Sequence, residues 1–363
     1  MSAKPTMPAL VFEGPDRLRL REWPRPEPGP GEVLIRVGAA TICGTDVRIV
    51  AGRKTRDVRI GHPIGHECAG TVAAVGPGVG GYAPGDRVGL CPVVSCGRCE
   101  YCRADHENLC ATRITLGYHT DGSFAEYMLI PALAVARGNL FKLPASVSFE
   151  AAALLEPLGC CINGQHEMGL GELTSGDDGR RLRLVIFGAG PIGLMHLLLA
   201  KARRGGTPRA DAPAAESAFE VVVVERLEHR RQAALRLGAD AACPPEDFNA
   251  EGEFDAAVIA VGVTELVPTA LRALRKGGRL NLFAGFDAGA VAAIDPNAIH
   301  YRQLTVTGAS ESRRRDYAEG LALLSAGRIR LDPLVTHRFA LADHEAAFRT
   351  AADGSAIKVA FSP

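Results

Sequence analysis

The sequence lacks a net charge, since its 41 lysine and arginine residues balance 41 aspartate and glutamate residues. A neutral chain has no overall field to hold nucleic acid or an anionic membrane, so we expect neither as a partner. A membrane-spanning run is also lacking. The longest uncharged stretch, between Arg183 and Lys201, contains a proline, a histidine and three glycines and falls short of the roughly 20 apolar residues required. Met1 to Glu13 lack the features of a secretory signal, and we expect a cytoplasmic protein.

The chain does have the length and composition of an ordinary globular protein. Its 363 residues are enough for two domains. With 47% hydrophobic and 23% charged residues it is unlike a disordered chain. In a reducing compartment its ten cysteines favour metal binding or catalysis over structural disulfides.

The pattern of apolar residues changes along the chain. From Leu10 to Leu90 short alternating segments are broken by Gly and Pro, which is typical of an antiparallel β domain. A helix is predicted to start at the N-cap Ser148 and to be interrupted by Pro157. Beyond it, apolar strands alternate with helices, which predicts a parallel sheet covered on both faces. The strands are expected at 182–187, 219–224, 254–261 and 279–284, and the helices at 192–203 and 228–237.

Two further features follow from the same pattern. Residues 204–217, rich in Gly, Pro and Ala, predict an unusually long loop between the first helix and the second strand of the parallel sheet. A strand at 304–308, a helix at 316–325 and a strand at 357–361 close the chain.

Four cysteines form the strongest motif. Cys96, Cys99 and Cys102 recur at two-residue intervals, and Cys110 follows on the returning loop. Four thiolates at this spacing can close a tetrahedron around zinc and leave no open position, so the site should be structural. Four unrelated thiols and a nucleic-acid zinc ribbon are the alternatives, and the neutral charge argues against the ribbon.

A second set of metal-ligating residue types is dispersed along the sequence. It comprises Cys43 in Ile-Cys-Gly-Thr-Asp, His66 and Glu67 in Gly-His-Glu, and Glu156 in Leu-Glu-Pro-Leu. A thiolate, an imidazole and a carboxylate from separate loops suit a zinc that keeps one position open for substrate. Each residue alone is weak evidence, because a single Cys or His is more often packed in a core.

The sequence ranks these ligands without fixing them. Cys43 and His66 come first, and the two glutamates follow and could exchange places. The His66 side chain and that of the next residue would point to opposite faces of a regular strand, so joint metal contact needs a bend that Gly65 permits. Asp46 suits a supporting role behind a ligand, and Thr45 suits proton transfer.

A third motif, Gly188-Ala-Gly-Pro-Ile-Gly193, follows an apolar strand and opens a helix. Its glycines allow a tight turn, the approach of a pyrophosphate and close packing of helix on strand. At the end of the next strand, Glu225 can accept hydrogen bonds from ribose hydroxyls, which favours NAD over NADP. Arg226 could stack on adenine or pair with a phosphate, and a solvated strand end is the alternative for both residues. The predicted cofactor contacts are Gly188, Gly190, Pro191, Ile192, Gly193, Glu225, Arg226, Val261 and Gly262.

Together these motifs resemble the zinc-containing medium-chain alcohol dehydrogenase family. The match runs nearly from end to end and includes Gly85-Asp-Arg-Val88 and Gly122-Ser-Phe-Ala-Glu-Tyr127. Glu156-Pro157-Leu158 resembles the polyol branch, typified by sorbitol (L-iditol) dehydrogenase, whereas ethanol-type enzymes carry cysteine at this ligand position. Threonine dehydrogenases share Cys-Gly-Thr-Asp but usually differ where this chain reads Glu-Pro-Leu.

The resemblance implies an α/β protein of two domains. A distorted β-barrel (GroES-like) catalytic domain would occupy residues 1–155, with a structural zinc lobe at about 91–112. A Rossmann domain with a doubly wound parallel sheet would occupy 156–298, and 299–363 would complete the catalytic domain. Two zinc ions per chain, one catalytic and one structural, and a homodimer or homotetramer are expected.

The resemblance also implies a reaction. Zinc would stabilise the alkoxide of a bound alcohol, hydride would pass to NAD, and Thr45 would receive the alcohol proton. Many relatives end this relay on a histidine three residues later, where this chain has Arg48. An arginine cannot act as an ordinary base near neutral pH, so the proton must leave through water or another group.

We therefore predict a zinc-containing, NAD-dependent oxidoreductase that reversibly oxidises a secondary alcohol of a polyol, cyclitol or sugar-like molecule to a ketone. An amino alcohol, such as threonine, an aminocyclitol or an amino sugar, is the alternative substrate. A non-catalytic nucleotide-binding protein is a third hypothesis, and the retained ligands and Thr45 argue against it. Packing roles are expected for Cys68, Cys91, Cys160, Cys161 and Cys243, and loop roles for His62 and His119.

Overall fold

The computed structural model describes residues 5–173, 180–203 and 217–363 and divides into two compact units. Unit 1 comprises residues 1–159 and 311–363, and unit 2 comprises residues 160–310. The chain passes from the first unit to the second within helix α5 (Leu155–Glu167). Apart from Ser217, the loop predicted at 204–217 lies outside the described residues.

Unit 1 is built mainly from short strands. They are β1 (Thr6–Phe12), β2 (Leu18–Pro24), β3 (Val33–Thr41), β4 (His62–Pro63), β5 (Glu67–Val75), β6 (Arg87–Leu90), β7 (Val93–Val94), β8 (Ile114–Thr115), β9 (Tyr127–Ile130), β10 (Leu140–Lys142), β17 (Val335–Phe339) and β18 (Lys358–Phe361). Its helices, besides the start of α5, are α1 (Gly44–Val50), α2 (Glu100–Arg103), α3 (Ala132–Ala136), α4 (Phe149–Ala153), α10 (Arg314–Ser325) and α11 (His344–Ala352).

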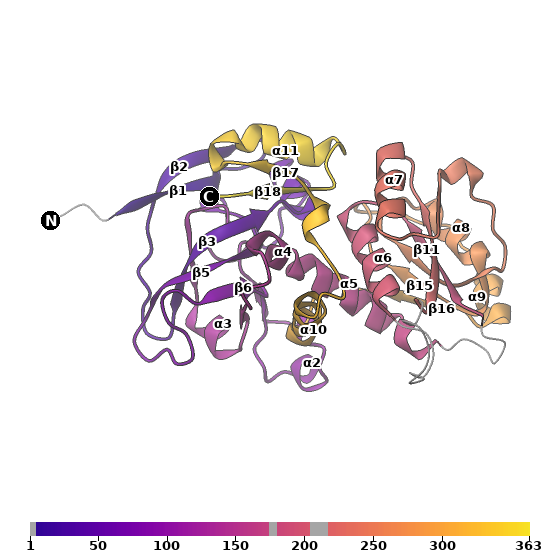
Figure 1. The fold of residues 1–363 in the computed structure, drawn as a ribbon, viewed down its shortest axis with the longest axis horizontal. Coiled ribbons are helices and arrows are strands. Elements are labelled where there is room, and N and C mark those ends of the chain that lie inside the picture. Colours follow the sequence, from indigo (N-terminus) through magenta and orange to yellow (C-terminus); the bar gives the residue numbers. More distant parts are fainter. Residues whose placement is uncertain (1–4, 174–179, 204–216) are drawn as a thin grey trace. The chain divides into compact units, whose positions relative to one another are not determined.

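The main sheet of unit 1 has the order β10-β6-β5-β3-β18-β17, and β9 also pairs with β3. All of these pairs are antiparallel except β17 with β18. A smaller sheet has the order β2-β1-β4, and α11 lies beside β17 and β18 (Figure 1). Buried aliphatic and aromatic side chains such as Ile35, Phe124 and Phe361 form the core between these elements. The prediction of an antiparallel β domain is confirmed.

The helix predicted at Ser148 starts as expected but is not broken at Pro157. The Ser148 hydroxyl accepts a hydrogen bond from the N–H of Ala151 at 3.0 Å and caps α4. The break falls at Leu154, before α5, so Pro157 lies in the first turn of a new helix. There its missing N–H costs no hydrogen bond, because the first N–H groups of a helix have no partner within it.

Unit 2 alternates strands with helices. The strands are β11 (Leu182–Phe187), β12 (Phe219–Val224), β13 (Ala241–Cys243), β14 (Phe254–Ile259), β15 (Leu274–Leu282) and β16 (Thr305–Gly308). The helices are α6 (Pro191–Ala202), α7 (Glu228–Arg236), α8 (Leu266–Ala273) and α9 (Pro296–Arg302). β11 and β12 have the predicted bounds and β14 has the predicted start, because continuous Val, Ile and Leu runs mark strands that are buried on both faces. β15 starts at Leu274 and not at residue 279, and β13 was not predicted.

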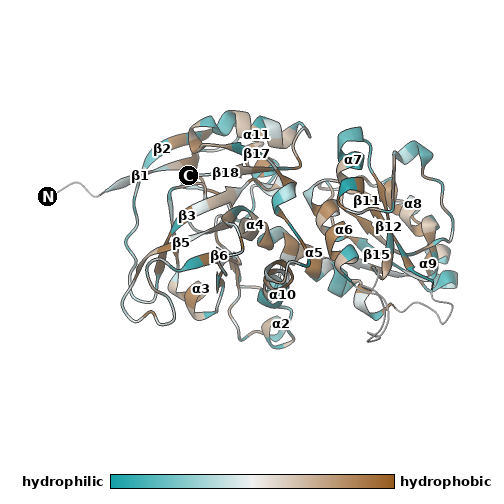
Figure 2. Cartoon of the chain, viewed as in Figure 1, coloured by the Kyte–Doolittle hydropathy of each residue, from teal (hydrophilic) through white to brown (hydrophobic). Residues whose placement is uncertain are grey.

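The sheet of unit 2 is parallel throughout, in the order β13-β12-β11-β14-β15-β16. In Figure 1, α6 lies on one side of these strands, and α8 and α9 lie on the other. Figure 2 shows the strands as hydrophobic and α7 as mostly hydrophilic, as expected for a covered sheet with solvated outer helices. This strand order and the two covered faces confirm the doubly wound sheet.

The C-terminal border of unit 2 lies at Ser310, beyond the predicted border at residue 298. The reason is β16, which pairs in parallel with β15 from Thr305 to Gly308 and so extends the sheet of unit 2. Residues 299–310 therefore do not belong to unit 1. In the ranges that the structure describes, no helix has both the length and the apolar composition needed to cross a membrane.

Candidate functional site

Cys43, His66 and Glu67 come together in unit 1. Cys43 is the N-cap of α1, which follows β3, while His66 precedes β5 and Glu67 is its first residue. One ligand atom from each lies within 4.8 Å of those of the other two. Tetrahedral zinc, with bonds of about 2.0–2.3 Å, holds its ligand atoms about 3.3–3.8 Å apart. Small side-chain adjustments would therefore let these three atoms reach one ion.

A bend before β5 lets neighbouring residues share this cluster. Gly65 has a φ of +103°, a conformation that L side chains rarely adopt. A Cβ at this position would also lie 2.6 Å from the ring of Phe124. The chain thus turns at Gly65, and both His66 and Glu67 can face Cys43.

Asp46 orients the imidazole of His66. Its Oδ1 lies 3.3 Å from Nδ1 of His66, while its Oδ2 accepts a hydrogen bond from the N–H of Cys43 at 2.9 Å. Burial disfavours a charged imidazole, but the Asp46 carboxylate more than offsets it, and the pKa of His66 is well above its ordinary value. The contact on Nδ1 leaves Nε2 as the nitrogen available to a metal, as expected for a carboxylate behind a histidine ligand.

Lys358 is part of this cluster and was not among the predicted site residues. It is 4% exposed, and its Nζ lies 2.9 Å from Oε1 and 2.6 Å from Oε2 of the fully buried Glu67. The hydroxyl of Thr41 donates to the same carboxylate, because Thr41 and Glu67 are register partners of β3 and β5. A lysine in the otherwise apolar strand β18 was the signal in the sequence that could have indicated this role.

Glu156 is buried near the cluster but is not one of its closest members. It is 7% exposed and lies in the first turn of α5. Among the described residues, the group of ligand atoms within 4.8 Å contains Glu67 and not Glu156. Burial lowers the pKa of Lys358, but the nearby acidic groups outweigh this effect and raise it, with Glu67 contributing most and Cys43 and Glu156 adding to it. Ligation by Glu156 therefore stays a prediction.

Tyr118 is a second residue that the sequence motifs did not indicate. Its hydroxyl lies 3.3 Å from Nε2 of His66, and the two rings are tilted with centroids 4.9 Å apart. Burial raises the pKa of Tyr118, the nearby acidic groups of Asp46, Cys43 and Glu156 raise it further, and Thr45 opposes the shift without reversing it. The phenol is therefore a protonated hydroxyl beside the cluster, next to the threonine predicted to take the substrate proton.

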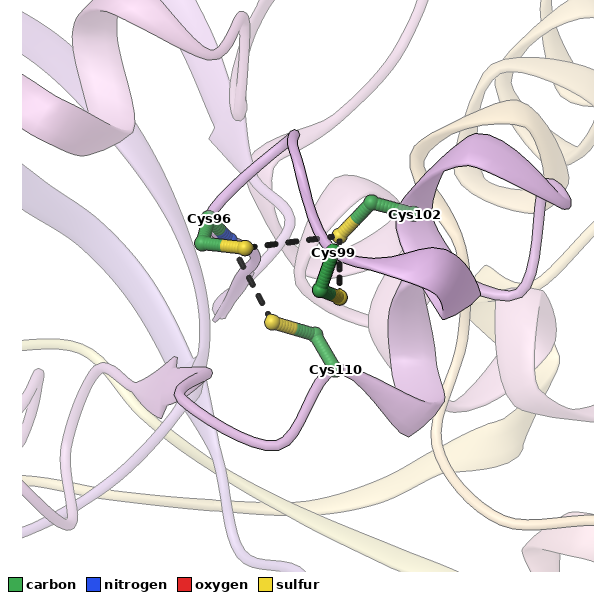
Figure 3. Close-up of side chains that lie close together, drawn as sticks. All are labelled: Cys96, Cys99, Cys102 and Cys110. Atoms are coloured by element: carbon green, nitrogen blue, oxygen red, sulfur yellow. Dashed lines mark hydrogen bonds between the residues drawn. The ribbon is translucent and has the colours of Figure 1, made fainter.

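The four clustered cysteines converge on one point of unit 1. Figure 3 shows their sulfur atoms turned toward one another, and all four lie within 4.8 Å of one another. The Sγ of Cys99 is 3.4 Å from that of Cys102, and Cys96 donates its N–H to the Sγ of Cys110. Hydrogen bonds from the backbone of Arg98 and Cys99 lower the pKa of Cys96 to about 6, which favours the thiolate that a metal binds.

Glu107 ties this cysteine lobe to the C-terminal part of unit 1. Its buried carboxylate accepts hydrogen bonds from the backbone N–H of Arg314 at 2.7 Å and from the hydroxyl of Ser95 at 3.1 Å. The Arg314 guanidinium lies 2.9 Å away, and that of Arg137 lies 3.7 Å away. The lobe is therefore anchored by charge as well as by its cysteines.

The glycine motif of unit 2 adopts the expected turn at the end of β11. Gly190 is the N-cap of α6 and Pro191 its first residue. A Cβ on Gly193 would lie 1.8 Å from the carbonyl oxygen of Gly188, so a larger residue would push the helix away from the turn. Backbone N–H groups at such a helix start are suited to a pyrophosphate.

Glu225 lies beside this turn. Its Oε2 accepts a hydrogen bond from the N–H of Ala189 at 2.7 Å and its Oε1 accepts one from the N–H of Leu227 at 2.9 Å. Arg226 is exposed. A Cβ on Gly188 would lie 3.3 Å from that of Val261, so this residue also borders the motif. The predicted cofactor residues thus meet at the carboxyl ends of β11, β12 and β14.

Within the described ranges, neither metal-ligand cluster includes another cysteine or histidine. Burial raises the pKa of Cys68 and Cys91 to about 12, so both are unreactive packing thiols at neutral pH. His62 contacts Oδ1 of Asp121 through Nδ1 at 2.8 Å, and His119 accepts a hydrogen bond from the N–H of Thr115.

Two protein-family models and a relative of known name match this chain. The model of the alcohol dehydrogenase GroES-like domain matches residues 29–144, and that of zinc-binding dehydrogenases matches residues 212–326. An L-threonine 3-dehydrogenase of Pyrococcus abyssi (strain GE5 / Orsay) is 34% identical over 349 residues, covering 93% of this chain and 92% of the relative. The predicted combination of a GroES-like and a Rossmann-type domain is confirmed.

Two solved structures are similar over nearly the whole chain. A protein described as a zinc-binding dehydrogenase from Sinorhizobium meliloti 1021, bound to NADP, has a TM-score of 0.85 and 28% identity, with 99% of both chains covered. A protein described as a short chain alcohol dehydrogenase from Escherichia coli CFT073, complexed with NADH, has a TM-score of 0.83 and 26% identity at the same coverage.

Proposed function

We propose that this chain, which belongs to the zinc-containing medium-chain alcohol dehydrogenase family, oxidises the secondary alcohol of a β-hydroxy-α-amino acid of the threonine type to a ketone and transfers hydride to NAD. The observation that carries this proposal is the 34% identity to an L-threonine 3-dehydrogenase over more than nine tenths of both chains. This comparison favours the amino-alcohol alternative over the polyol substrate that the Glu-Pro-Leu sequence suggests.

The donor sets fit zinc at two places. Cys43, His66 and Glu67 offer sulfur, nitrogen and oxygen, the set typical of a zinc with an open position, and Glu156 is the candidate to exchange with Glu67. Zinc bound there supplies a positive charge that stabilises the developing alkoxide of the substrate. The four clustered cysteines form a closed sulfur set, which suits a structural zinc.

Thr45 and Tyr118 provide the hydroxyl groups beside this cluster. We assign proton acceptance from the substrate alcohol to the Thr45 hydroxyl, which is close enough to Tyr118 to influence its pKa. Arg48, three residues further along α1, cannot accept the proton at neutral pH. The proton therefore leaves through the neighbouring hydroxyl or through water.

The amino group of the substrate finds a complementary charge in the same region. Glu156 is close enough to contribute to the raised pKa of Tyr118, and a carboxylate in this position attracts a substrate ammonium group. Glu67, in contrast, is already neutralised by Lys358.

NAD is the cofactor that the glycine motif and Glu225 favour. A carboxylate at the end of β12 accepts hydrogen bonds from the ribose hydroxyls of NAD and repels the 2′-phosphate of NADP. Glu225 is held in this position by the N–H groups of Ala189 and Leu227.

The proposal is tested by following NADH absorbance with a panel of alcohols under identical conditions. The panel contains L-threonine, L-threoninamide, 2,3-butanediol, sorbitol, myo-inositol and an aminocyclitol. We expect the highest kcat/KM with L-threonine and little reduction of NADP. A higher kcat/KM with a polyol or cyclitol would reject the amino-acid substrate in favour of the second candidate, a polyol dehydrogenase.

We also infer that two copies of the chain associate through the edge of the sheet in unit 2. β16 is the end strand of this sheet and pairs with β15 on one side. Four apolar or aromatic side chains are exposed in this region, at Val291 (83%), Ile294 (44%), Tyr301 (74%) and Val306 (38%). An open strand edge beside apolar surface favours pairing with a second strand, and a two-fold dimer would let each copy cover the other.

Light scattering combined with size-exclusion chromatography tests this association. The wild-type chain should elute as a dimer or tetramer, and Val306→Lys should shift it toward the monomer while its circular dichroism spectrum stays unchanged. A monomeric wild type, or a variant that associates like the wild type, would reject this interface.

A further inference from the structure

The segment that follows α1 is strongly cationic in a chain of zero net charge. Residues 48–59 carry a single acid, Asp57, and five basic residues, which are Arg48, Arg53, Lys54, Arg56 and Arg59. The acid is already engaged, since its carboxylate lies 3.6 Å from Nε of Arg56 and 4.0 Å from Nε2 of His119. The segment therefore holds positive charge that its own acid does not neutralise.

Lys54 differs from most of these cations in its surroundings. It is partly buried, whereas Arg53, Arg56 and Arg59 are exposed. Its Nζ lies 5.0 Å from the centre of the Tyr118 ring, a cation–π contact that holds the ammonium group in place.

Tyr118 connects Lys54 to the metal-ligand cluster. The centre of its ring is 5.0 Å from Nζ of Lys54 and 4.9 Å from the ring centre of His66, and its hydroxyl is 3.3 Å from Nε2 of His66. The positive charge of Lys54 is thus one aromatic ring away from the nitrogen that faces the metal position.

We propose that Lys54, held against Tyr118, binds the carboxylate of the substrate while the hydroxyl of Tyr118 contacts the carbinol oxygen at the Cys43–His66–Glu67 cluster. This assignment rests on the proposed function. In a β-hydroxy acid the carboxylate is two carbon–carbon bonds from the carbinol carbon, which matches a cation one ring away from the cluster.

Lys54 thereby supplies the positive charge that meets the carboxylate of the substrate. A polyol has no carboxylate to engage this charge, so the subsite selects an alcohol that carries a carboxylate over one that does not.

The test compares Lys54→Gln, Lys54→Arg and Arg56→Gln in the zinc-loaded enzyme. Arg56→Gln is the matched control, because it removes the same charge from the same segment at an exposed position away from Tyr118. A hydrogen bond to a charged group is lost in Lys54→Gln, so the KM for L-threonine should rise about 10- to 100-fold. Its KM for L-threoninamide, which lacks the negative charge of the carboxylate, should stay within about threefold, and Lys54→Arg should restore most of the affinity for L-threonine.

A binding measurement separates this subsite from the proposed reaction. Calorimetric titration of the zinc- and NADH-loaded protein uses 3-hydroxybutanoate and its neutral amide, 3-hydroxybutanamide. The wild type and Arg56→Gln should bind the acid more tightly than the amide, and Lys54→Gln should bind both equally. If L-threonine is not oxidised but this difference is found, the proposed substrate is wrong and the carboxylate subsite stands.

Three results would overturn the subsite. The first is unchanged KM and binding in Lys54→Gln while L-threonine is oxidised, which would leave the proposed function intact. The second is an equal loss of affinity for the carboxylate-bearing ligands in Lys54→Gln and Arg56→Gln, which would indicate that only the overall positive charge of the segment matters. The third is weaker NADH binding in Lys54→Gln with unaltered binding of the acid, which would assign Lys54 to the cofactor.

Discussion

Replacing Lys358 with methionine should strongly destabilise unit 1, because it leaves the charge of Glu67 unpaired in the interior. Lys358 is 4% exposed and Glu67 is fully buried. The ammonium group lies 2.9 Å and 2.6 Å from the two carboxylate oxygens. Methionine has a similar length and fills the same space, so the substitution removes the charge with little loss of packing.

The expected loss follows from the burial of the pair. Removing one partner of a buried ion pair costs about 3–5 kcal/mol, since the other charge then lacks compensation. Thr41 still donates a hydrogen bond to the carboxylate, so we expect a value near the lower end, about 3 kcal/mol. Adding Glu67→Gln to Lys358→Met removes the uncompensated carboxylate charge. The double variant should therefore lose at least about 2 kcal/mol less free energy of unfolding than the sum of the losses in the two single variants.

Urea unfolding at neutral pH, after a chelator has removed bound metal from every sample, measures these free energies, because a zinc ion on Glu67 would itself compensate the charge of the carboxylate. Lys142→Met is the control, because Lys142 also pairs with a carboxylate of unit 1, that of Asp86 at 2.8 Å, but its side chain is 57% exposed. Lys142→Met should lower the free energy of unfolding by less than about 1 kcal/mol. The reasoning is refuted if Lys358→Met costs no more than Lys142→Met, or if the double variant shows no coupling.

Three further predictions concern acid stability, metal content and cofactor choice. Burial lowers the pKa of His196 from 6.5 to about 3, so the unfolded chain takes up this proton first. As the pH falls from 6.5 to about 3, His196 should therefore lower the free energy of unfolding by up to about 1.4 kcal/mol per pH unit, and a slope that is no smaller in His196→Leu would contradict this. Metal analysis should find two zinc ions per chain. Cys99→Ser should lose the structural zinc. Cys43→Ser should lose the second zinc and the activity but should still bind NADH. A single zinc per wild-type chain would contradict this prediction. Glu225→Gln should weaken NADH binding about tenfold and NADPH binding less in fluorescence titrations, whereas an equal loss for both would argue against ribose recognition by Glu225.

The strands of unit 2 were largely predictable because burial on both faces leaves a continuous apolar run. Phe219–Val224 is such a run and has the predicted bounds. β16 was also expected as a strand, but its mostly exposed residues carry no information on which sheet it joins. Its pairing with β15, which moves the border of unit 2 to Ser310, appears only in the structure.

The candidate metal site shows a similar division. The residue types of Cys43, His66 and Glu67 indicated a shared ion, and the glycine before His66 indicated the required bend. The sequence could not indicate that Lys358 lies opposite Glu67, because 291 positions separate them. This contact depends on the pairing of β18 with β3. Tyr118 and Lys54 lie in loops whose side chains follow no periodic pattern.

The insertion of β18 between β3 and β17 has a consequence for how the protein is made. Unit 2 is one uninterrupted stretch, so it can finish folding while the ribosome is still adding residues. Unit 1 cannot, because the strand that brings the counter-ion to Glu67 follows all of unit 2 in the chain. Until that strand emerges, the nascent chain holds Glu67 in an incomplete sheet without its lysine partner.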